Sequence, residues 1–453
     1  MRACLKSRMC LQFLKNTTNN NTISPMVKKD EFTVAFVGGG TGGHIYPGLA
    51  VADSLRVLCK KHNRLVHIFW IGNNSPLDKT IVEKSIGEDG AKSADAFYGI
   101  PSGKLRRYVS FKNFLDIFKI LAGFFASFFI LLREKPALLF SKGGFVSVPP
   151  CFAARLLKIP VFTHECDFTP GLATKINSKS AKKVFVSYSE TAQFFSSKLD
   201  VELTGNPVRP VFYSASAERG MRFLSLENSS GNTGASALGR SKSENADEGE
   251  QNGCENSPEA VSARKPILLV LGGSLGARQI NTLVKENLLW LCRNFIVVHQ
   301  TGEKNADENA YSGDDAEILK NYKPFPFIYT EMPDVIAAAD IVLSRAGANS
   351  LWECATLAKP LVLIPLCGSG TRGDQEDNAE YFKKEEAALV LARDNATGEK
   401  LVACLKTLLD ENERMRLSKN IAVLCGAVCG AVCGAVHPAE KIADLIYNEV
   451  VEI

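Results

Sequence analysis

A histidine closes a stretch that holds five glycines and one threonine, Val37–His44 (VGGGTGGH). Glycines at this density let a ligand approach the main chain, and free N–H groups ahead of a helix can bind an anion or a sugar ring. Gly38, Gly40 and Gly43 also fit the GxGxxG spacing of a dinucleotide-binding turn. The second strand, however, ends WIGNNS, without the acid that holds the ribose of a nicotinamide dinucleotide. A pyrophosphate therefore fits this turn better, with a purely structural glycine turn as the alternative.

A second glycine turn, Gly272–Gly276 (GGSLG), follows the apolar run PILLVL. Ser274 adds a hydroxyl donor to the main-chain amides of this turn. Two arginines offer positive charge towards phosphates: Arg345, just after the run DIVLS, and Arg209, in the segment GNPVRP. Either arginine could instead form an ion pair on the surface.

Strand, glycine turn and helix alternate through most of the sequence. The run FTVAFV leads into the first glycine turn, and IYPGLAVADSLRVLCKK follows it with helical spacing. Similar units begin at VHIFWIG, ALLFSKGG, PVFTHE and KKVFVSY, and a second series begins at PILLVLGGSLGARQIN. This alternation predicts parallel sheets with helices on both faces. We therefore expect an α/β protein of two doubly wound, Rossmann-like domains.

The expected organisation has four parts. Residues 1–30 lack the apolar core and the cleavage site of a secretion signal, and we expect a disordered extension. An N-terminal domain is expected at 31–209 and a C-terminal domain at 210–436. A Ser-, Asn-, Gly- and Glu-rich insertion at 227–264 has little to bury and is expected to be disordered. Residues 437–453 are expected to form a helix that packs back on the N-terminal domain.

Composition argues against several classes of protein. A net charge of +4 over 453 residues, without a polybasic tract, argues against nucleic acid as a partner. The thirteen cysteines are scattered and show no CxxC pair, so we expect reduced thiols in the cytoplasm. The longest apolar run, Ile120–Leu132, is shorter than the roughly 20 residues that a membrane-spanning helix requires.

Seven motifs in this order resemble the MurG family of peptidoglycan glycosyltransferases. They are GGGTGGHIYPGLAVAD, SKGGFVSVPP, HECDFTPGLATKI, LTGNPVRP, LVLGGSLGARQIN, SRAGANSLWE and TRGDQEDNAEYF. The resemblance implies the GT-B architecture, with two Rossmann-like domains, an interdomain cleft and a UDP-sugar held mainly by the C-terminal domain. It also implies inverting transfer of N-acetylglucosamine from UDP to the C4 hydroxyl of polyprenyl-linked lipid I, which gives lipid II.

The resemblance assigns roles to residues of the first turn and of the segment AGANSLWE. His44 corresponds to the family's proposed base for the acceptor hydroxyl; a sugar-binding or helix-capping histidine is the alternative. Thr41, Gly42 and Gly43 would line the sugar or the acceptor diphosphate. Glu353 would accept hydrogen bonds from the uridine ribose, although its spacing from the serine three residues earlier also fits a capping box.

Further residues follow from the other motifs. Gln375 and Asn378, together with the preceding Asp374, would hold hydroxyls of the donor sugar, unless they only form the solvated start of a helix. Main chain around Ile328 and Tyr329 would form the uracil pocket.

Asp167 departs from the family pattern. It stands where some members have an asparagine that often contacts substrate, and a carboxylate there could repel a diphosphate.

The chain contains no DxD triplet, the usual carboxylate platform for a divalent ion on a nucleotide diphosphate. We therefore expect no metal and no cofactor. The charge of the leaving group would be met by helix N-termini, Ser274 and arginines.

The segment Pro101–Lys135 predicts a membrane contact. It carries seven Lys and Arg residues against two acids, beside the aromatic-rich run FLDIFKILAGFFASFFILL. An amphipathic surface of this kind fits an anionic lipid surface, and places the protein peripherally on the cytoplasmic face of the inner membrane. A helix buried against the sheet is the alternative.

Two other functions compete with the transferase. A sugar-nucleotide epimerase or another GT-B-like enzyme would not need the membrane segment or the motif HECDFTPGLATKI. A nucleotide-binding regulator without catalysis would leave His44 dispensable.

Overall fold

The computed structural model describes most of the chain between residues 31 and 452. The described ranges are 31–87, 89–103, 111–226, 264–272, 276–302, 315–368, 371–429 and 436–452, with the side chains of 111–115 and 428–429 left out. Residues 1–30, most of the 227–264 insertion and Ser274 therefore lie outside the described residues.

The N-terminal part forms a seven-stranded parallel sheet with the strand order β3-β2-β1-β4-β5-β6-β7. Its strands are β1 Glu31–Val37, β2 Leu65–Asn73, β3 Ala96–Ile100, β4 Leu138–Ser141, β5 Val161–Glu165, β6 Lys183–Val186 and β7 Asp200–Leu203. Val37, at the end of β1, pairs with Ile71 of β2 on one side and with Ser141 of β4 on the other. The first strand is thus central, and its carboxyl end opens directly into the glycine turn.

Helices cover both faces of this sheet, which is why its strands are continuous apolar runs. They are α1 Tyr46–Lys61, α2 Pro76–Lys84, α3 Phe111–Glu134, α4 Val148–Leu156 and α5 Leu172–Asn177, with the 3-10 turns η1 Gly42–His44, η2 Phe145–Ser147 and η3 Ser189–Phe194. Alternate residues of β1 enter different cores. Val34 and Phe36 pack with α1, whereas Ala35 and Val37 pack with α3 and α4.

The C-terminal part repeats this plan with a six-stranded parallel sheet in the order β10-β9-β8-β11-β12-β13. Its strands are β8 Ile267–Leu271, β9 Ile296–Gln300, β10 Tyr322–Phe325, β11 Ile341–Ser344, β12 Leu361–Leu363 and β13 Ala388–Val390. The surrounding helices are α6 Ala217–Phe223, α7 Arg278–Glu286, α8 Leu288–Asn294, α9 Ala316–Leu319, α10 Met332–Ala338, α11 Ala348–Thr356, α12 Asp374–Lys384, α13 Gly398–Thr407 and α14 Glu411–Cys429. The 3-10 turn η4 Pro210–Phe212 lies in the connection between the two sheets.

Both sheets reverse their winding direction once. In the first sheet the reversal lies between β1 and β4, and in the second it lies between β8 and β11. Ligands of doubly wound sheets bind outside the carboxyl ends of the strands at such a switch point. We therefore expect the ligand-binding residues in the connections after β1, β4, β8 and β11.

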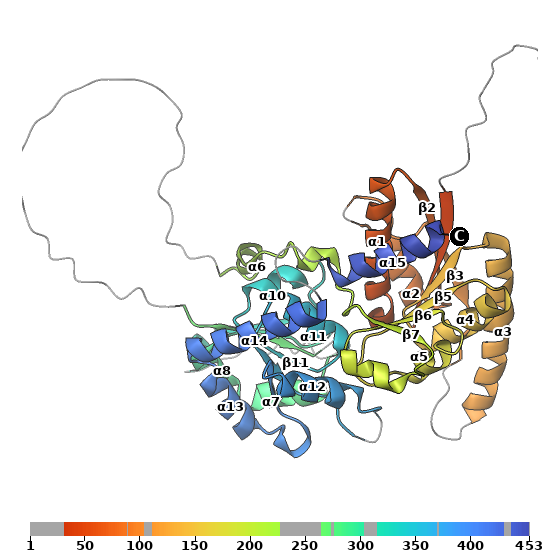
Figure 1. The fold of residues 1–453 in the computed structure, drawn as a ribbon. Helices are drawn as coiled ribbons and strands as arrows, with labels where there is room; N and C mark the ends of the chain where they lie inside the picture. The colour runs from red at the N-terminus through yellow and green to blue at the C-terminus, as the bar shows by residue number, and fades with distance from the viewer. Residues whose placement is uncertain are drawn as a thin grey trace, which may run out of the picture.

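The last helix, α15 Pro438–Val451, returns from the C-terminal domain and lies along α1 (Figure 1). Its residues Ile442, Ala443 and Ile446 are buried in the same core as Val34 and Phe36. At the surface, the ammonium group of Lys182 binds the carboxylate of Glu449 at 2.7 Å. The N-terminal core is thus completed by residues from the far end of the chain.

This packing predicts a loss of stability in the variant Ile442→Ala. Removal of a fully buried isoleucine should lower the free energy of unfolding by about 2 to 5 kcal/mol, because a cavity remains between α15 and α1. Val451→Ala, at a position that is 39% exposed, is the matched control and should change it by less than about 0.5 kcal/mol. Denaturant unfolding measures both values. Equal stability of Ile442→Ala and the parent would show that α15 does not complete the core.

Candidate functional site

The two domains meet through hydrogen bonds between loops at the carboxyl ends of their strands. The side-chain amide of Asn349, in the first turn of α11, donates to the carbonyl oxygen of Gly43 at 2.9 Å. Thr169, after β5, donates its hydroxyl to the carboxylate of Asp377 in α12 at 2.6 Å. The carboxyl edges of the two sheets therefore face a common interface.

The turn that carries His44 is held by its own main chain and by one buried acid. Gly40 has a φ of 83°, which favours glycine, and its N–H donates to the carboxylate of Asp78 at 2.9 Å. Nδ1 of His44 lies 2.9 Å from the hydroxyl oxygen of Thr41. On its other side the imidazole faces Gly144, where a Cβ would lie 3.1 Å from the ring. Glycine in the connection after β4 thus makes room for the histidine at the switch point of the first sheet.

Arg209 lies beside this turn, where η4 begins. Its guanidinium group stacks over Tyr46, 5.0 Å from the ring centre, and over Phe212 at 5.2 Å. Its Nε is buried and makes no hydrogen bond within the described part of the chain. Arg209 therefore presents a partly desolvated positive charge next to the His44 turn.

Glu353 lies inside α11, on the C-terminal side of the interface. Burial raises the pKa of its carboxyl group to about 7, and the positive charge of Arg209 partly opposes this rise. The helix begins at Ala348 with Gly347 as its N-cap, so Ser350 is an internal residue and the capping-box alternative is wrong. The carboxyl group of Glu353 is therefore not used to cap its own helix.

Arg345 follows β11 directly, at the switch point of the second sheet. It is half-buried, and burial lowers the pKa of its guanidinium group. Its Nη1 is buried and has no hydrogen-bond partner among the described residues. A buried donor without a partner is costly in free energy, which is consistent with a site for an anion.

Asp167 takes part in an ionic contact between the domains. Its carboxylate accepts hydrogen bonds from Asn378 at 3.1 Å and from Arg372 at 3.2 Å, both in the C-terminal domain. Burial and the nearby charges of Glu165 and Asp374 raise the pKa of Asp167 to about 6.

A possible group of metal ligands lies at the same place. Ligand atoms of Glu165, Cys166 and Asp167 lie within 4.8 Å of one another. Both oxygens of Glu165, however, already accept main-chain hydrogen bonds from Cys166, Asp167 and Gly171. These carboxylates hold the loop after β5 and the domain interface.

Asn378 and Gln375 both lie on α12, and both side chains are engaged within the protein. Asn378 is fully buried; its amide oxygen accepts from the N–H of Phe168 at 2.8 Å, and its amide nitrogen donates to Asp167 and to the carbonyl of Ala346. The amide oxygen of Gln375 accepts from the N–H of Leu366 at 2.9 Å. Asp374 starts the same helix and contacts Arg372 at 3.3 Å. In this structure the side chain of Asn378 therefore joins the two domains.

The segment predicted to hold uracil follows β10, at the carboxyl edge of the second sheet. Ile328 is buried, and its N–H donates to the side chain of Gln300 at 3.0 Å. Tyr329, by contrast, is 65% exposed, and its ring lies 4.6 Å from that of Phe327.

Several residues that position the site were not identified from the sequence. They include Asn349, Asn206, Thr169 and Arg372. A cluster of aromatic rings from both domains also fills the interface: Tyr188 lies 5.5 Å from Trp352 and 4.8 Å from Tyr381, between ring centres. Most of these residues fall within the quoted motifs, but their partners lie more than a hundred residues away.

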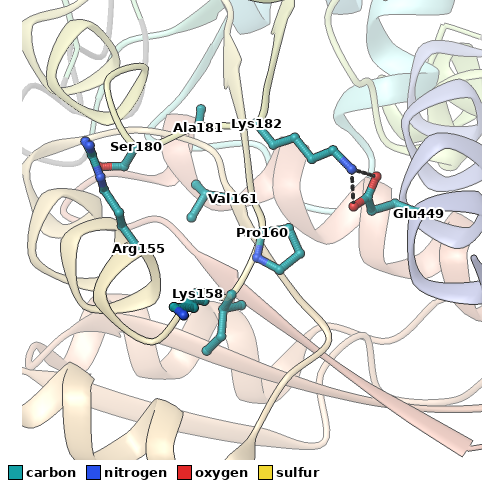
Figure 2. A pocket seen from close by; sticks show the side chains of 9 residues that line it. Arg155, Lys158, Pro160, Val161, Ser180, Ala181, Lys182 and Glu449 are labelled. Carbon is teal, nitrogen blue, oxygen red and sulfur yellow. Dashed lines mark hydrogen bonds and ion pairs between the residues drawn. The ribbon is translucent and has the colours of Figure 1, made fainter. Parts of the chain in front are cut away.

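One cavity of the N-terminal domain lies away from this interface. A cavity of about 420 Å³ is lined by Arg155, Lys158, Pro160, Lys182 and neighbours, with Lys182 bound to Glu449 (Figure 2). These residues flank the amino ends of β5 and β6, opposite the edge that carries His44. The cavity is therefore not part of the candidate site.

The chain matches two domains of one family. Residues 34–186 match the glycosyltransferase family 28 N-terminal domain, and residues 267–426 match the glycosyltransferase family 28 C-terminal domain.

Curated relatives cover nearly the whole chain. It is 45% identical over 425 residues to the UDP-N-acetylglucosamine--N-acetylmuramyl-(pentapeptide) pyrophosphoryl-undecaprenol N-acetylglucosamine transferase of Treponema denticola, with 91% of this chain and 96% of that protein covered. It is 35% identical over 380 residues to an enzyme of the same name, numbered 2, from Bacillus cereus, with 84% and 92% covered. Among solved structures, Acinetobacter baumannii MurG shares the fold, with a TM-score of 0.60, 21% identity and 92% and 99% covered.

The ionic contact around Asp167 predicts a pH-dependent stability. The pKa of this carboxyl group is about 6 in the folded protein against an ordinary 3.8, so the folded state binds the proton more tightly than the unfolded chain. The charged carboxylate therefore opposes folding above pH 6, and this cost disappears as the pH falls from 6 towards 3.8. Asp167→Asn should raise Tm by at least about 2 °C at pH 8, and by less at pH 5.

Thermal unfolding of the parent and the variant at both pH values measures this difference. A shift in Tm that is the same at pH 5 and pH 8 would contradict a raised pKa at Asp167.

Proposed function

The chain belongs to the MurG family of glycosyltransferases, and on this premise we propose how its residues carry out the transfer. It is a GT-B enzyme of peptidoglycan synthesis that transfers N-acetylglucosamine from UDP-N-acetylglucosamine to lipid I, which gives lipid II. An epimerase has less support, because the relatives at 45% and 35% identity are named as transferases.

His44 is the base of the proposed reaction. The C4 hydroxyl oxygen of the acceptor attacks C1 of N-acetylglucosamine, the bond from C1 to the diphosphate oxygen breaks, UDP leaves, and the hydroxyl proton passes to His44. Inversion follows because attack and departure occur on opposite faces of C1. If Nδ1–H of His44 donates to the hydroxyl oxygen of Thr41, Nε2 carries the lone pair that a base requires.

The observation that carries this proposal is the placement of His44 opposite the start of α11. The side-chain amide of Asn349, in the first turn of α11, donates to the carbonyl oxygen of Gly43, the residue before His44, at 2.9 Å, so base and helix terminus face the same interface. The first amides of a helix have no partner within the helix and attract negative charge. We infer that these amides, with Arg345 and Ser274, stabilise the departing diphosphate without a metal.

The remaining contacts follow the two sides of the interface. Glu353, whose carboxyl group is buried and not used as a cap, would accept hydrogen bonds from the ribose, while Tyr329 and Ile328 would border the uracil. Gln375 would lie at the donor sugar, and the fully buried Asn378 would support this side of the site through its bonds to Phe168 and Asp167. Thr41, Gly42, Gly43, Asp167 and Arg209 would border the sugar or the acceptor diphosphate from the first domain.

An exposed apolar face of α3 supports contact with an anionic membrane surface. Six large apolar residues, each between 48% and 63% exposed, recur along this helix: Ile117, Phe118, Leu121, Phe125, Phe129 and Leu132. Spacings of three, four and seven residues place them on one side of the helix, and the Lys119 and Arg133 side chains are exposed beside them. No helix in the described ranges is long and apolar enough to cross a membrane. We propose peripheral attachment at the cytoplasmic face of the inner membrane, where lipid I can be reached.

His44→Ala should lower kcat by about 10² to 10⁴, because no other group replaces the base. Transfer from radiolabelled UDP-N-acetylglucosamine to a short-chain lipid I analogue measures this loss, with His62→Ala as a histidine control at the end of α1. The parent enzyme should keep its activity in the presence of a chelator. Unchanged turnover in His44→Ala would remove the assignment of the base, and activity that required added magnesium would contradict stabilisation by main-chain amides.

The double variant Phe125→Glu/Phe129→Glu should weaken binding to vesicles with anionic lipid by at least about tenfold, because two carboxylates replace exposed apolar surface. Vesicle sedimentation measures the binding. Val423→Glu, on the 63% exposed surface of α14, adds a charge away from α3 and is the control. Equal binding by all three proteins would place the membrane contact elsewhere.

A further inference from the structure

We propose that Asn349 is a positioning residue, which fixes the His44 turn against the helix terminus that faces the donor. This inference rests on the proposed function of His44 as the base. It assigns to Asn349 a task that its side chain performs on the other domain, 306 residues away in the sequence.

The side chain of Asn349 makes two hydrogen bonds across the interface. Its amide nitrogen donates to the carbonyl oxygen of Gly43 at 2.9 Å, and its amide oxygen accepts from the side chain of Asn206 at 3.2 Å. Asn206 is fully buried, so it fixes the amide of Asn349 in a defined orientation. At Gly43 a Cβ would lie 3.1 Å from the amide nitrogen of Asn349. The asparagine therefore packs directly on the main chain of the turn.

The carbonyl of Gly43 belongs to the peptide unit that continues into His44. A peptide unit is planar, so holding this oxygen orients the plane from which His44 extends. The N–H of His44 in turn donates to the carbonyl of Thr41 at 3.1 Å. Gly42 and Gly43 have no side chains that could restrict the main chain, and glycine loses more conformational freedom on ordering than other residues. To the hydrogen bonds that the turn makes within itself, Asn349 adds a restraint from the second domain.

The position of Asn349 in α11 gives this contact a further consequence. It is the second residue of the helix, and the N-cap Gly347 has no side chain with which to cap the first turn. The main chain of residues 348–350 thus belongs to the proposed diphosphate site, while the side chain of Asn349 holds the turn of the base. Docking of the two domains and orientation of His44 are in this way coupled through one residue.

If Asn349 only held the two domains together, without positioning His44, the effect of its loss would be different. A second interdomain hydrogen bond allows this comparison. Thr169 donates to Asp377 at 2.6 Å, also between the domains, but within the described residues neither partner forms a hydrogen bond with the His44 turn. If Asn349 only held the domains together, its loss would resemble the loss of the Thr169 hydroxyl. If it positions His44, the two variants differ in their dependence on His44.

The experiment is a double-mutant cycle in the lipid I transfer assay. Asn349→Leu removes both hydrogen bonds at similar volume, and Asn349→Ser is a smaller second variant in case the first does not fold. Each is combined with His44→Ala, and Thr169→Val is treated in the same way. Asn420→Ala, which removes a hydrogen bond from α14 to the carbonyl of Glu386, is the control. Thermal unfolding establishes that each variant is folded.

We expect Asn349→Leu and Asn349→Ser to lower kcat by about tenfold, with KM for UDP-N-acetylglucosamine changed by less than about threefold. Added to His44→Ala, they should cause no further loss, whereas the effect of Thr169→Val should multiply with it. Parental kcat in the Asn349 variants, or losses that multiply with that of His44→Ala, would overturn the inference while leaving the transferase function intact. A parent protein without transfer activity would overturn the proposed function itself, and this inference with it.

Discussion

The hydrogen bonds between the two carboxyl edges are the constraint on which the rest of the structure depends. Each sheet alone carries a glycine-rich sequence at its switch point, and each contains only part of the expected chemistry. The fully buried amide of Asn378 reaches the main chain of Phe168 and the carboxylate of Asp167, and thereby brings the parts together. An amide is suited to this because it offers a donor and an acceptor at once, without the desolvation cost of a charge.

Burial also determines the electrostatics of the site. Burial raises the pKa of Glu353 to about 7, and burial with the nearby charges of Glu165 and Asp374 raises that of Asp167 to about 6. Arg345 has a buried donor without a partner among the described residues. Charges and dipoles interact more strongly in such an environment than in water. Arginines and helix amides that are fixed before the substrate arrives can therefore stabilise a departing diphosphate with little reorganisation.

The sequence predicts the architecture well, because the apolar patterns of strands and helices and the glycine turns between them are local signals. Apolar β-branched runs followed by glycine turns and helical spacing identify the two parallel sheets and the switch-point turns, including the one that carries His44. Local patterns also mislead: the serine three residues before Glu353 fits a capping box, yet α11 begins at Ala348 with Gly347 as its N-cap.

The interface, by contrast, could not be derived from spacing. Asn349 and Gly43 are 306 residues apart, and Asn378 and Phe168 are 210 apart. Both asparagines stand in motifs that indicate substrate contacts, and only the docked domains show that their side chains also join the two halves. Long-range pairing of polar groups leaves no periodicity in the sequence.

A crystal structure with UDP-N-acetylglucosamine bound tests the central claim most directly. We expect the diphosphate at the N-terminus of α11, with the anomeric carbon facing His44 and the contact between Asn349 and Gly43 retained. A nucleotide bound outside the interdomain interface, for example in the cavity around Arg155 and Lys182, would contradict the account.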